Sequence, residues 1–393
     1  MTENYCCYNC NSPAVELFSE IKNAPVHSVL LMPDRETALQ YPKRDIILGF
    51  CQYCGFIFNV AFDASMHEYS SRYEETQGFS PTFNTFHKNL ANYLIHQYNL
   101  YNKDIIEIGC GKGEFLTMLC ESGNNRGVGF DPSYIIERNQ SAGKNRITFI
   151  KDFYSEKYAA YTGNFICCKM TLEHIQHTAQ FLNTVKHSIK NRHNTIVFFQ
   201  VPNVTPILRE VGFWDIYYEH CSYFSTVSLA RLFRKCGFDV MNLSMIYHDQ
   251  YLMIEARMGS DGKEIPLEDE DDFEKLFEDV QYFSRNYQNR LDIWKRKVKE
   301  IIGNGHRIVI WGSGSKGVSF LNYLDLRDEI EFVVDINPYK HNMYMPGTGQ
   351  KIVGPTFLKE YRPDSIIIMN PVYREEIQDE LNRLGVTAEL LIV

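Results

Sequence analysis

Long apolar stretches are missing from this sequence. It contains no run of about 18 apolar residues, and its first residues, MTENYCCYNC, have no basic region followed by an apolar segment. We therefore expect neither a membrane span nor a signal peptide. A cytoplasmic protein with no membrane partner is the simplest expectation.

The sequence also lacks a basic excess. Its 40 lysines and arginines are outnumbered by 49 aspartates and glutamates, which gives a formal net charge of −9 at pH 7. Nucleic-acid-binding surfaces are normally basic, so we expect no nucleic-acid partner. The 11 cysteines include the adjacent Cys167 and Cys168 in an apolar segment, which favours a reducing compartment over a disulfide framework.

The length of 393 residues predicts two or three domains, because one core rarely grows beyond ~250–300 residues. Residues 1–75 carry two CxxC motifs, Cys7 with Cys10 and Cys51 with Cys54. Four thiolates form the usual closed site of a structural Zn²⁺ ion, so this segment is expected to be a small zinc-binding domain. Two alternatives stay open: Cys6 could replace Cys7 as a ligand, and a CxxC pair could serve redox chemistry.

Residues 76–258 alternate apolar strands with helical patterns, which predicts a parallel sheet flanked by helices. The most informative stretch is DIIEIGCGKGEF, residues 104–115, in which a strand runs into a GxGxG turn and then a helix. Glycine has no Cβ, so such a turn can bring its amides against a ligand at a helix N-terminus. Asp131 ends the next strand, where a carboxylate usually accepts hydrogen bonds from ribose hydroxyls, and Asp152 ends a third.

These successive strand ends, with KMTLEHI after a fourth strand, resemble the class I S-adenosylmethionine-dependent methyltransferases. The resemblance implies a pocket for the methionine and ribose parts of the cofactor, with Asp131 at the ribose hydroxyls and Asp152 near the adenine amine. The residues that would shape the pocket beside the methyl donor are Glu107, Gly109, Gly111 and Gly113.

The remaining chain is expected to form an acidic linker with a long helix, residues 259–303, and a second Rossmann-like domain, residues 304–393. The linker contains LEDEDD, and RIVIWGSGSKGVSF repeats the order of strand, glycine turn and helix. Its GxGxxG pattern, at Gly312, Gly314 and Gly317, is typical of dinucleotide sites. The turn could cradle a phosphate, or it could only allow tight packing of strand against helix.

The segment GFWDIYYEHCSYFS, residues 212–225, is similar to the IYHEH segment of sugar C-methyltransferases, with Tyr218 in place of the first histidine. That family combines a four-cysteine zinc domain, a methyltransferase core and a C-terminal Rossmann-like domain. The resemblance implies an α/β enzyme whose substrate is a nucleotide-linked ketosugar, held in part by Gly312, Gly314, Lys316 and Gly317. Either Tyr69 or Tyr73 would be the aromatic residue of an active-site lid.

Methylation of carbon requires a carbon nucleophile. A base can remove the proton next to the carbonyl of a 4-ketosugar, and the resulting enolate can attack the sulfonium methyl group. We predict His220 as the base because imidazole titrates close to neutral pH, with Tyr217 as the donor to the enolate oxygen and Glu219 as an orienting group. By resemblance, His174 belongs to the same catalytic set.

Two other functions remain alternatives at this point. An O- or N-methyltransferase acting on another metabolite needs only an acceptor lone pair and a base, which His220 could also supply. A non-catalytic module could use the cysteine motifs to bind RNA or protein. The sequence leaves the oligomeric state open, with a monomer plausible, and five histidines in polar helical contexts are expected at the surface: His87, His96, His177, His187 and His193.

Overall fold

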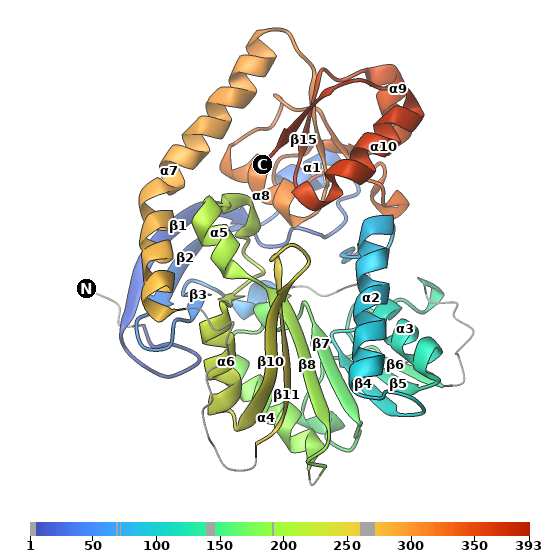
Figure 1. The fold of residues 1–393 in the computed structure, drawn as a ribbon. Helices are drawn as coiled ribbons and strands as arrows, with labels where there is room; N and C mark the ends of the chain where they lie inside the picture. Colours follow the sequence, from blue (N-terminus) through green and yellow to red (C-terminus); the bar gives the residue numbers. More distant parts are fainter. Residues whose placement is uncertain (1–4, 68–69, 71, 139–145, 191, 260–271) are drawn as a thin grey trace.

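The computed structural model describes residues 5–67, 70, 72–138, 146–190, 192–259 and 272–393. This described part of the chain builds three sheets, stacked along the long axis of the molecule in Figure 1. The Tyr69 alternative for the lid residue lies outside the described residues, as do residues 267–271 of the acidic run.

The first sheet is antiparallel and orders its strands β1-β2-β3-β9. Its elements are β1 (Val15–Pro25), α1 (Arg35–Leu39), β2 (Lys43–Cys51), β3 (Ile57–Asn59) and β9 (Ser222–Tyr223). Strand β9 comes from much later in the chain, and it pairs Tyr223 with Ile57 and Ser222 with Phe58. The N-terminal sheet therefore holds the end of the IYYEH segment directly.

The second sheet orders its strands β10-β11-β8-β7-β4-β5-β6. It is parallel from β8 to β6, whereas β11 runs antiparallel to β8 and to β10. Its strands are β4 (Asp104–Ile108), β5 (Arg126–Phe130), β6 (Ile147–Ile150), β7 (Phe165–Lys169), β8 (Ile196–Pro202), β10 (Phe238–Ile246) and β11 (Tyr251–Met258). The parallel strands bring the carboxyl ends of β4, β5, β7 and β8 to one edge, as the sequence predicts.

Helices cover both faces of the second sheet because its strands alternate their buried side chains between the faces. On one face, Ile105, Cys167 and Phe198 pack against α2 (Pro81–Gln97) and α3 (Glu114–Gly123). On the other face, Ile106 and Val197 pack against α4 (Thr178–Ile189) and α6 (Thr226–Lys235). Helix α5 (Val204–Glu210) follows β8.

The third sheet is parallel and orders its strands β14-β13-β12-β15-β16. Its elements are β12 (Ile308–Trp311), α8 (Ser315–Tyr323), β13 (Phe332–Val334), β14 (Lys351–Val353), α9 (Leu358–Tyr361), β15 (Ser365–Ile368), α10 (Arg374–Leu384) and β16 (Glu389–Ile392). Helix α8 packs on one face through Phe320, and α10 packs on the other through Ile377 and Leu381. The predicted second Rossmann-like unit is therefore present.

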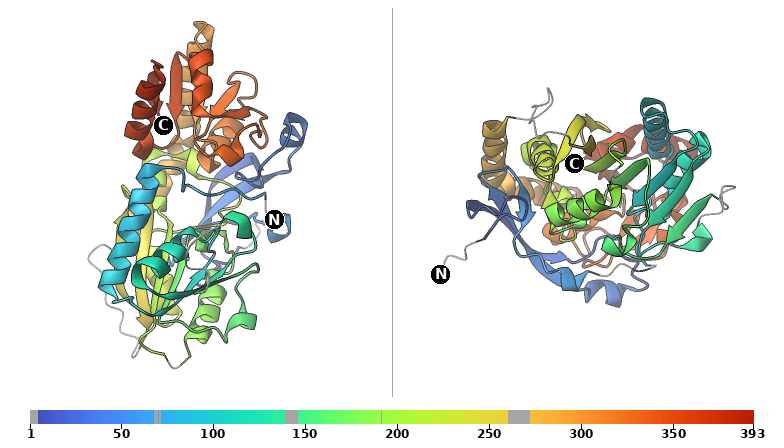
Figure 2. Two further views of the ribbon diagram at one scale, coloured as in Figure 1. Left: turned by 90° about the vertical axis from the view of Figure 1, so that its right-hand side faces the viewer. Right: turned by 90° about the horizontal axis from the view of Figure 1, so that it is seen from below.

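Helix α7 (Phe273–Gly303) confirms the predicted long helix and runs from the first sheet to the third (Figures 1 and 2). Its buried side chains follow one face: Leu276, Val280, Phe283, Leu291, Trp294 and Val298. Ser284 donates a hydrogen bond to the carbonyl of Phe18 in β1 at 2.6 Å, and Trp294 packs against Phe320 of α8. The helix thus joins the first and third sheets into one apolar core.

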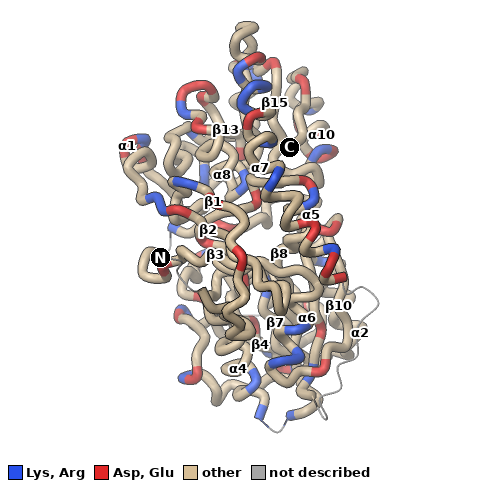
Figure 3. The backbone as a smooth tube through the Cα atoms, turned by 90° about the vertical axis from the view of Figure 1, so that its left-hand side faces the viewer, with Lys and Arg blue, Asp and Glu red and all other residues tan. Residues whose placement is uncertain are grey.

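Short 3₁₀ helices occupy many of the connections: η1 (Ala64–Met66), η2 (Ile136–Arg138), η3 (Glu156–Tyr158), η4 (Leu172–His174), η5 (Phe213–Asp215), η6 (Pro338–Lys340), η7 (Pro355–Phe357) and η8 (Pro371–Tyr373). Among the described residues, no helix combines the length and the apolar composition of a membrane span. Figure 3 shows basic and acidic residues interspersed along the backbone.

Candidate active site

A cavity of about 1160 Å³ lies where the second and third sheets face each other. Its walls include the GxGxG turn, the IYYEH segment, the loop after β7 and the glycine turn after β12. Cavities that hold one ligand have volumes of roughly 300–1,000 Å³, so this one has room for two molecules. The structure therefore brings together the segments that the sequence marks for cofactor, chemistry and acceptor.

The GxGxG turn has the backbone that glycine permits. Gly109, Gly111 and Gly113 have φ values of +70°, +53° and +82°. A Cβ on Gly109 would lie 1.9 Å from Oγ1 of Thr171, in the loop after β7. A side chain at Gly109 is therefore excluded both by the backbone conformation and by this neighbour.

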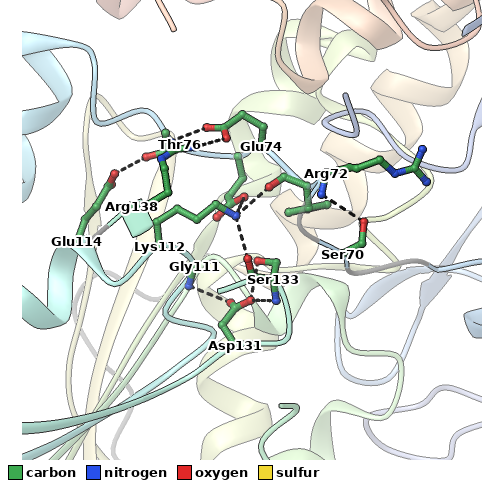
Figure 4. A network of polar contacts seen from close by, with 12 residues as sticks. Ser70, Arg72, Glu74, Thr76, Gly111, Lys112, Glu114, Asp131, Ser133 and Arg138 are labelled. Carbon is green, nitrogen blue, oxygen red and sulfur yellow. Dashed lines mark hydrogen bonds and ion pairs between the residues drawn. The ribbon is translucent and has the colours of Figure 1, made fainter. Parts of the chain in front are cut away.

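Asp131 lies beside the turn and holds it in place. Its Oδ2 accepts a hydrogen bond from the amide of Gly111 at 2.9 Å, and its Oδ1 accepts bonds from the amide and hydroxyl of Ser133, both at 2.7 Å (Figure 4). Lys112 connects this turn to the segment of Tyr73, because its ammonium donates hydrogen bonds to the carbonyls of Ser133 and Tyr73. The segment in which the sequence predicts a lid is thus attached to the glycine turn through one buried lysine.

Glu107 is buried at the end of β4 and accepts a hydrogen bond from the amide of Leu116 at 2.9 Å. Burial raises its pKa, and the charge of nearby Lys169 opposes the rise. Burial in turn lowers the pKa of Lys169, whose ammonium lies 2.9 Å from Nε2 of His87. The sequence analysis did not single out Lys169, although a charged residue ending an apolar strand is a usable signal.

The surface prediction for His87 is wrong. Its side chain is 7% exposed and faces the cavity from α2, packed against Phe83 and Phe115. The other four histidines expected at the surface are exposed. The polar residues next to His87 in the sequence belong to the opposite face of α2, which is why the local context misleads.

Asp152 lines the cavity after β6, where the cofactor adenine is expected. Its carboxylate accepts hydrogen bonds from the Tyr158 hydroxyl at 2.6 Å and the Lys157 ammonium at 2.9 Å, and these bonds lower its pKa. Phe153 beside it is 58% exposed and also faces the cavity. The structure therefore offers a carboxylate and an aromatic ring together at this position.

His174 and His220 both line the cavity and lie face to edge, with ring centroids 4.7 Å apart and an interplanar angle of 88°. Burial lowers the pKa of both imidazoles, and for His220 the neighbouring His174 adds to the decrease. The Tyr217 ring lies 4.2 Å from that of His220, and burial raises the pKa of its phenol well above the usual value. A neutral imidazole and a protonated phenol are the forms that a base and a hydrogen-bond donor need.

Glu219 is 1% exposed and is the acceptor at the centre of a hydrogen-bond network. It accepts bonds from His27 Nδ1 at 3.3 Å, from the amide and hydroxyl of Ser28, and from the Tyr73 hydroxyl at 3.0 Å. Burial alone would raise its pKa, but the hydrogen bond and charge of His27 lower it. No local pattern in the sequence marks His27, which lies in the loop after β1.

Tyr218, which replaces a histidine of the resembled motif, points away from the cavity. Its side chain is fully buried, its hydroxyl accepts a hydrogen bond from the amide of Asp63 at 2.8 Å, and its ring packs against Phe62. This tyrosine anchors the segment to the N-terminal region. The contacts of Tyr218 in the IYYEH segment are therefore structural.

Glu173 precedes His174 in η4 and is a further cavity residue that the sequence analysis quoted without assigning a role. One of its carboxylate oxygens and one ring nitrogen each of His174 and His220 lie within 4.8 Å of one another. Burial raises the pKa of Glu173 to about 8.

The glycine turn after β12 reaches the same cavity with Gly312, Gly314, Lys316 and Gly317. A Cβ on Gly317 would lie 2.3 Å from the carbonyl oxygen of Gly312, so this glycine permits tight packing of strand against helix. Nothing lies within 4 Å of the corresponding atom on Gly314, which faces open space. Lys316 pairs with Asp215 at 2.8 Å and so connects the third sheet to the IYYEH segment.

The four predicted metal ligands meet in the N-terminal region, with Cys7 Sγ 3.6 Å from Cys54 Sγ and Cys10 Sγ 3.5 Å from Cys51 Sγ. Zn–S bonds of about 2.3 Å at tetrahedral angles place sulfur atoms nearly 4 Å apart, so the cluster fits Zn²⁺. Cys6 is exposed and outside the cluster. The cysteine positions therefore agree with a closed structural site.

Comparison with known proteins assigns the two larger parts of the chain. Residues 83–243 match the family model of a methyltransferase domain, and residues 260–391 match that of a C-methyltransferase C-terminal domain. The C-methyltransferase NovU of Streptomyces niveus is 23% identical over 310 residues, which are 74% of this chain and 72% of that protein.

Two solved structures are similar to somewhat less than half of the chain. Magnesium protoporphyrin IX methyltransferase of Synechocystis PCC 6803, with bound SAH, is 14% identical over 45% of this chain and 84% of its own, with a TM-score of 0.37. The 1,6-didemethyltoxoflavin-N1-methyltransferase of Burkholderia thailandensis is 15% identical over 44% of this chain and 79% of its own, with a TM-score of 0.36. With a methyltransferase domain around the GxGxG turn and a C-methyltransferase C-terminal domain after it, the chain is an S-adenosylmethionine-dependent methyltransferase.

Proposed function

We propose that this enzyme methylates a carbon atom of a nucleotide-linked ketosugar. The observation that carries the proposal is that one cavity of about 1160 Å³ is lined by the GxGxG turn, by His220 and by the glycine turn of the C-terminal domain. The match of residues 260–391 to a C-methyltransferase domain and the similarity to NovU support carbon as the acceptor atom.

In the proposed reaction, S-adenosylmethionine lies against Gly109, Gly111 and Gly113, with its ribose at Asp131 and its adenine between Asp152 and Phe153. The cavity wall supports these positions, because the turn offers amides at the start of α3 and Asp131 offers carboxylate oxygens. The sulfonium methyl group would then face the pair His174 and His220.

His220 removes the proton next to the ketone, and the Tyr217 hydroxyl stabilises the enolate oxygen. The enolate carbon then attacks the methyl group in line. Burial favours the neutral imidazole that a base requires, and the two rings lie 4.2 Å apart. Glu219 orients its neighbours in the segment, Tyr217 and His220, because its hydrogen bonds to Tyr73 and His27 fix the segment in place.

The acceptor's diphosphate would lie at the glycine turn after β12. Gly314 is the N-cap of α8 and faces open space, and Lys316 supplies a positive charge beside it. Backbone amides at a helix N-terminus and a lysine together form a favourable environment for phosphate. In this assignment, the GxGxxG turn binds the diphosphate of the acceptor and does not bind a nicotinamide cofactor.

In the N-terminal region, we propose that Cys7, Cys10, Cys51 and Cys54 hold one structural Zn²⁺ ion. The ion would connect the start of the chain to the end of β2, next to the sheet that holds β9 and the catalytic segment. Its contribution is to folding, because a closed four-thiolate site leaves no position for a substrate.

The test is incubation of the full chain with methyl-labelled S-adenosylmethionine and a panel of 4-ketosugar nucleotides, followed by analysis of the product for a new C–C bond. We expect His220→Ala to abolish transfer while calorimetric affinity for S-adenosylmethionine stays within about threefold, since general base catalysis contributes 10²–10⁴-fold. A methyl group on oxygen or nitrogen would favour the alternative reaction. Loss of cofactor affinity in His220→Ala would show that this histidine belongs to the cofactor site.

A further inference from the structure

Glu173 lacks the hydrogen bonds that three other carboxylates of the cavity accept. It is 1% exposed, it lines the cavity, and neither carboxylate oxygen has a hydrogen-bond partner among the described residues. Glu107, Asp131 and Glu219, by contrast, all accept hydrogen bonds. Burying an ionised carboxylate without a partner costs folding free energy. The position of Glu173 in the cavity therefore suggests that its protonation has a role in the reaction.

The neighbours of Glu173 are the two histidines of the proposed reaction. An oxygen of Glu173 and ring nitrogens of His174 and His220 all lie within 4.8 Å of one another. A hydrogen bond of about 2.9 Å thus requires movements of at most about 2 Å. Other titratable groups that face Glu173 are the thiols of Cys168 and Cys221 and the phenol of Tyr251, all with pKa values raised by burial and therefore neutral.

We propose that Glu173 is the final acceptor of the proton that leaves the acceptor carbon, and that it receives this proton through His220. The inference rests on the proposed function for the identity of the carbon acid. The C–H bond breaks and its electron pair forms the new C–C bond to the methyl group. The S–C bond breaks with its pair left on sulfur, and the proton ends on the Glu173 carboxylate.

This assignment keeps the charge of the closed site constant. Before transfer, the sulfonium cation faces the Glu173 carboxylate, and after transfer a neutral thioether faces a neutral carboxylic acid. The raised pKa of Glu173, about 8, agrees with a carboxyl group that is protonated when no cation is bound. Catalysis therefore never leaves a single unbalanced charge beside the buried histidines.

The test needs no acceptor. Calorimetry of S-adenosylmethionine and S-adenosylhomocysteine binding at pH 7, repeated in two buffers of different ionisation enthalpy, counts the protons released by each ligand. We expect the cationic ligand to release roughly 0.5–1 proton more than the neutral one, because its charge ionises Glu173. In Glu173→Gln this difference should become smaller by the share of Glu173, and a remainder should persist because Glu75 and Glu107, two other carboxyl groups of the cavity, also have pKa values raised by burial. Glu210→Gln, an exposed acid on the cavity wall, should retain the full difference.

Glu173→Gln should also reduce the turnover number about 100-fold with little change in the KM of the methyl donor, as expected for a lost proton acceptor. Its melting temperature should not fall, because the substitution removes a buried carboxylate without a partner. Equal proton release by the two ligands in the unmodified enzyme would overturn the proposal. So would a Mn²⁺ ion that binds the unmodified enzyme in the cavity but not Glu173→Gln, because the carboxylate would then be a metal ligand.

The two proposals fail separately. A ketosugar panel that yields no product, with proton release as expected, would contradict only the proposed acceptor. Product formation with no difference in proton release would contradict only the role of Glu173.

Discussion

The hydroxyl of Tyr73 donates a hydrogen bond to Oε2 of Glu219 at 3.0 Å, although 146 residues separate them in the chain. The same carboxylate binds His27 and Ser28 from the loop after β1. One buried acid therefore holds together the segment of Tyr73, the loop after β1 and the IYYEH segment. Burial raises the pKa of Glu219, but the hydrogen bond and charge of His27, the charge of His174 and the hydrogen bond of Ser28 outweigh it, so the pKa is lowered and the acid is charged at neutral pH.

We predict that Glu219→Gln lowers the turnover number about 10- to 100-fold, because a neutral amide weakens hydrogen bonds worth about 1.5–3 kcal/mol when the acceptor is charged. Methyl transfer to the acceptor and S-adenosylmethionine affinity by calorimetry are the two measurements. Cofactor affinity should change little, since Glu219 lies outside the GxGxG turn. Glu210→Gln is the control, and a variant with unchanged turnover would remove Glu219 from the proposed orienting role.

The GxGxG turn yields a second prediction, which separates steric exclusion from backbone strain. Gly109→Ala should abolish S-adenosylmethionine binding, because the new Cβ would lie 1.9 Å from Oγ1 of Thr171. Gly385 is the matched control: its φ of +65° resembles the +70° of Gly109, but nothing lies within 4 Å of the position that a Cβ would take there. Gly385→Ala should therefore cost only about 1 kcal/mol in unfolding free energy and should retain binding. Equal losses of cofactor affinity in both variants would contradict the steric explanation.

The sequence predicts the parts of the site that depend on local rules. Strand ends followed by glycine or acid locate Gly109 and Asp131, since parallel strands bring their carboxyl ends to one edge. The spacing of apolar residues likewise locates α7, and the paired CxxC motifs locate the cysteine cluster.

The parts that sequence reasoning missed depend on contacts between distant segments. Nothing near His27 marks it as a partner of Glu219, because the pairing arises only when β9 joins the N-terminal sheet. His87 illustrates the same limit. Lys88 and Asn89, which follow it in the sequence, are polar and exposed, but its own face of α2 is turned toward Phe115 and the cavity.

The cysteine cluster predicts one zinc ion per chain by elemental analysis. Cys51→Ser should lose the ion and lower the melting temperature, because a closed thiolate site contributes folding energy. The control is Cys6→Ser, since Cys6 is exposed and outside the cluster. In a protein refolded with Co²⁺, thiolate charge-transfer bands should be present in the control and absent in Cys51→Ser. A cobalt-loaded protein without these bands would count against thiolate ligation.

The stability of the protein should decrease as the pH falls below about 6.5, with a specific contribution from His87. Burial, followed by the charge of Lys169, lowers the pKa of His87 from 6.5 to about 2. Above pH 6.5 the ring is neutral in both folded and unfolded chains, so His87 does not change the free energy of unfolding with pH there. Below pH 6.5 the unfolded chain binds a proton that the folded chain does not, so the free energy of unfolding decreases until the pH reaches the folded-state pKa.

Between pH 7 and pH 5.5 this single histidine should reduce the free energy of unfolding by about 1 kcal/mol. In His87→Gln, whose amide oxygen can still accept from Lys169, the decrease over this range should be smaller by that amount in urea titrations. His96→Gln, an exposed position on the same helix, should leave the pH dependence unchanged. Other histidines, including the half-buried His67 with a pKa lowered to about 3, will keep a residual slope in every variant. If His87→Gln and His96→Gln showed the same slope, His87 would have to titrate alike in the folded and unfolded chains, contrary to its burial.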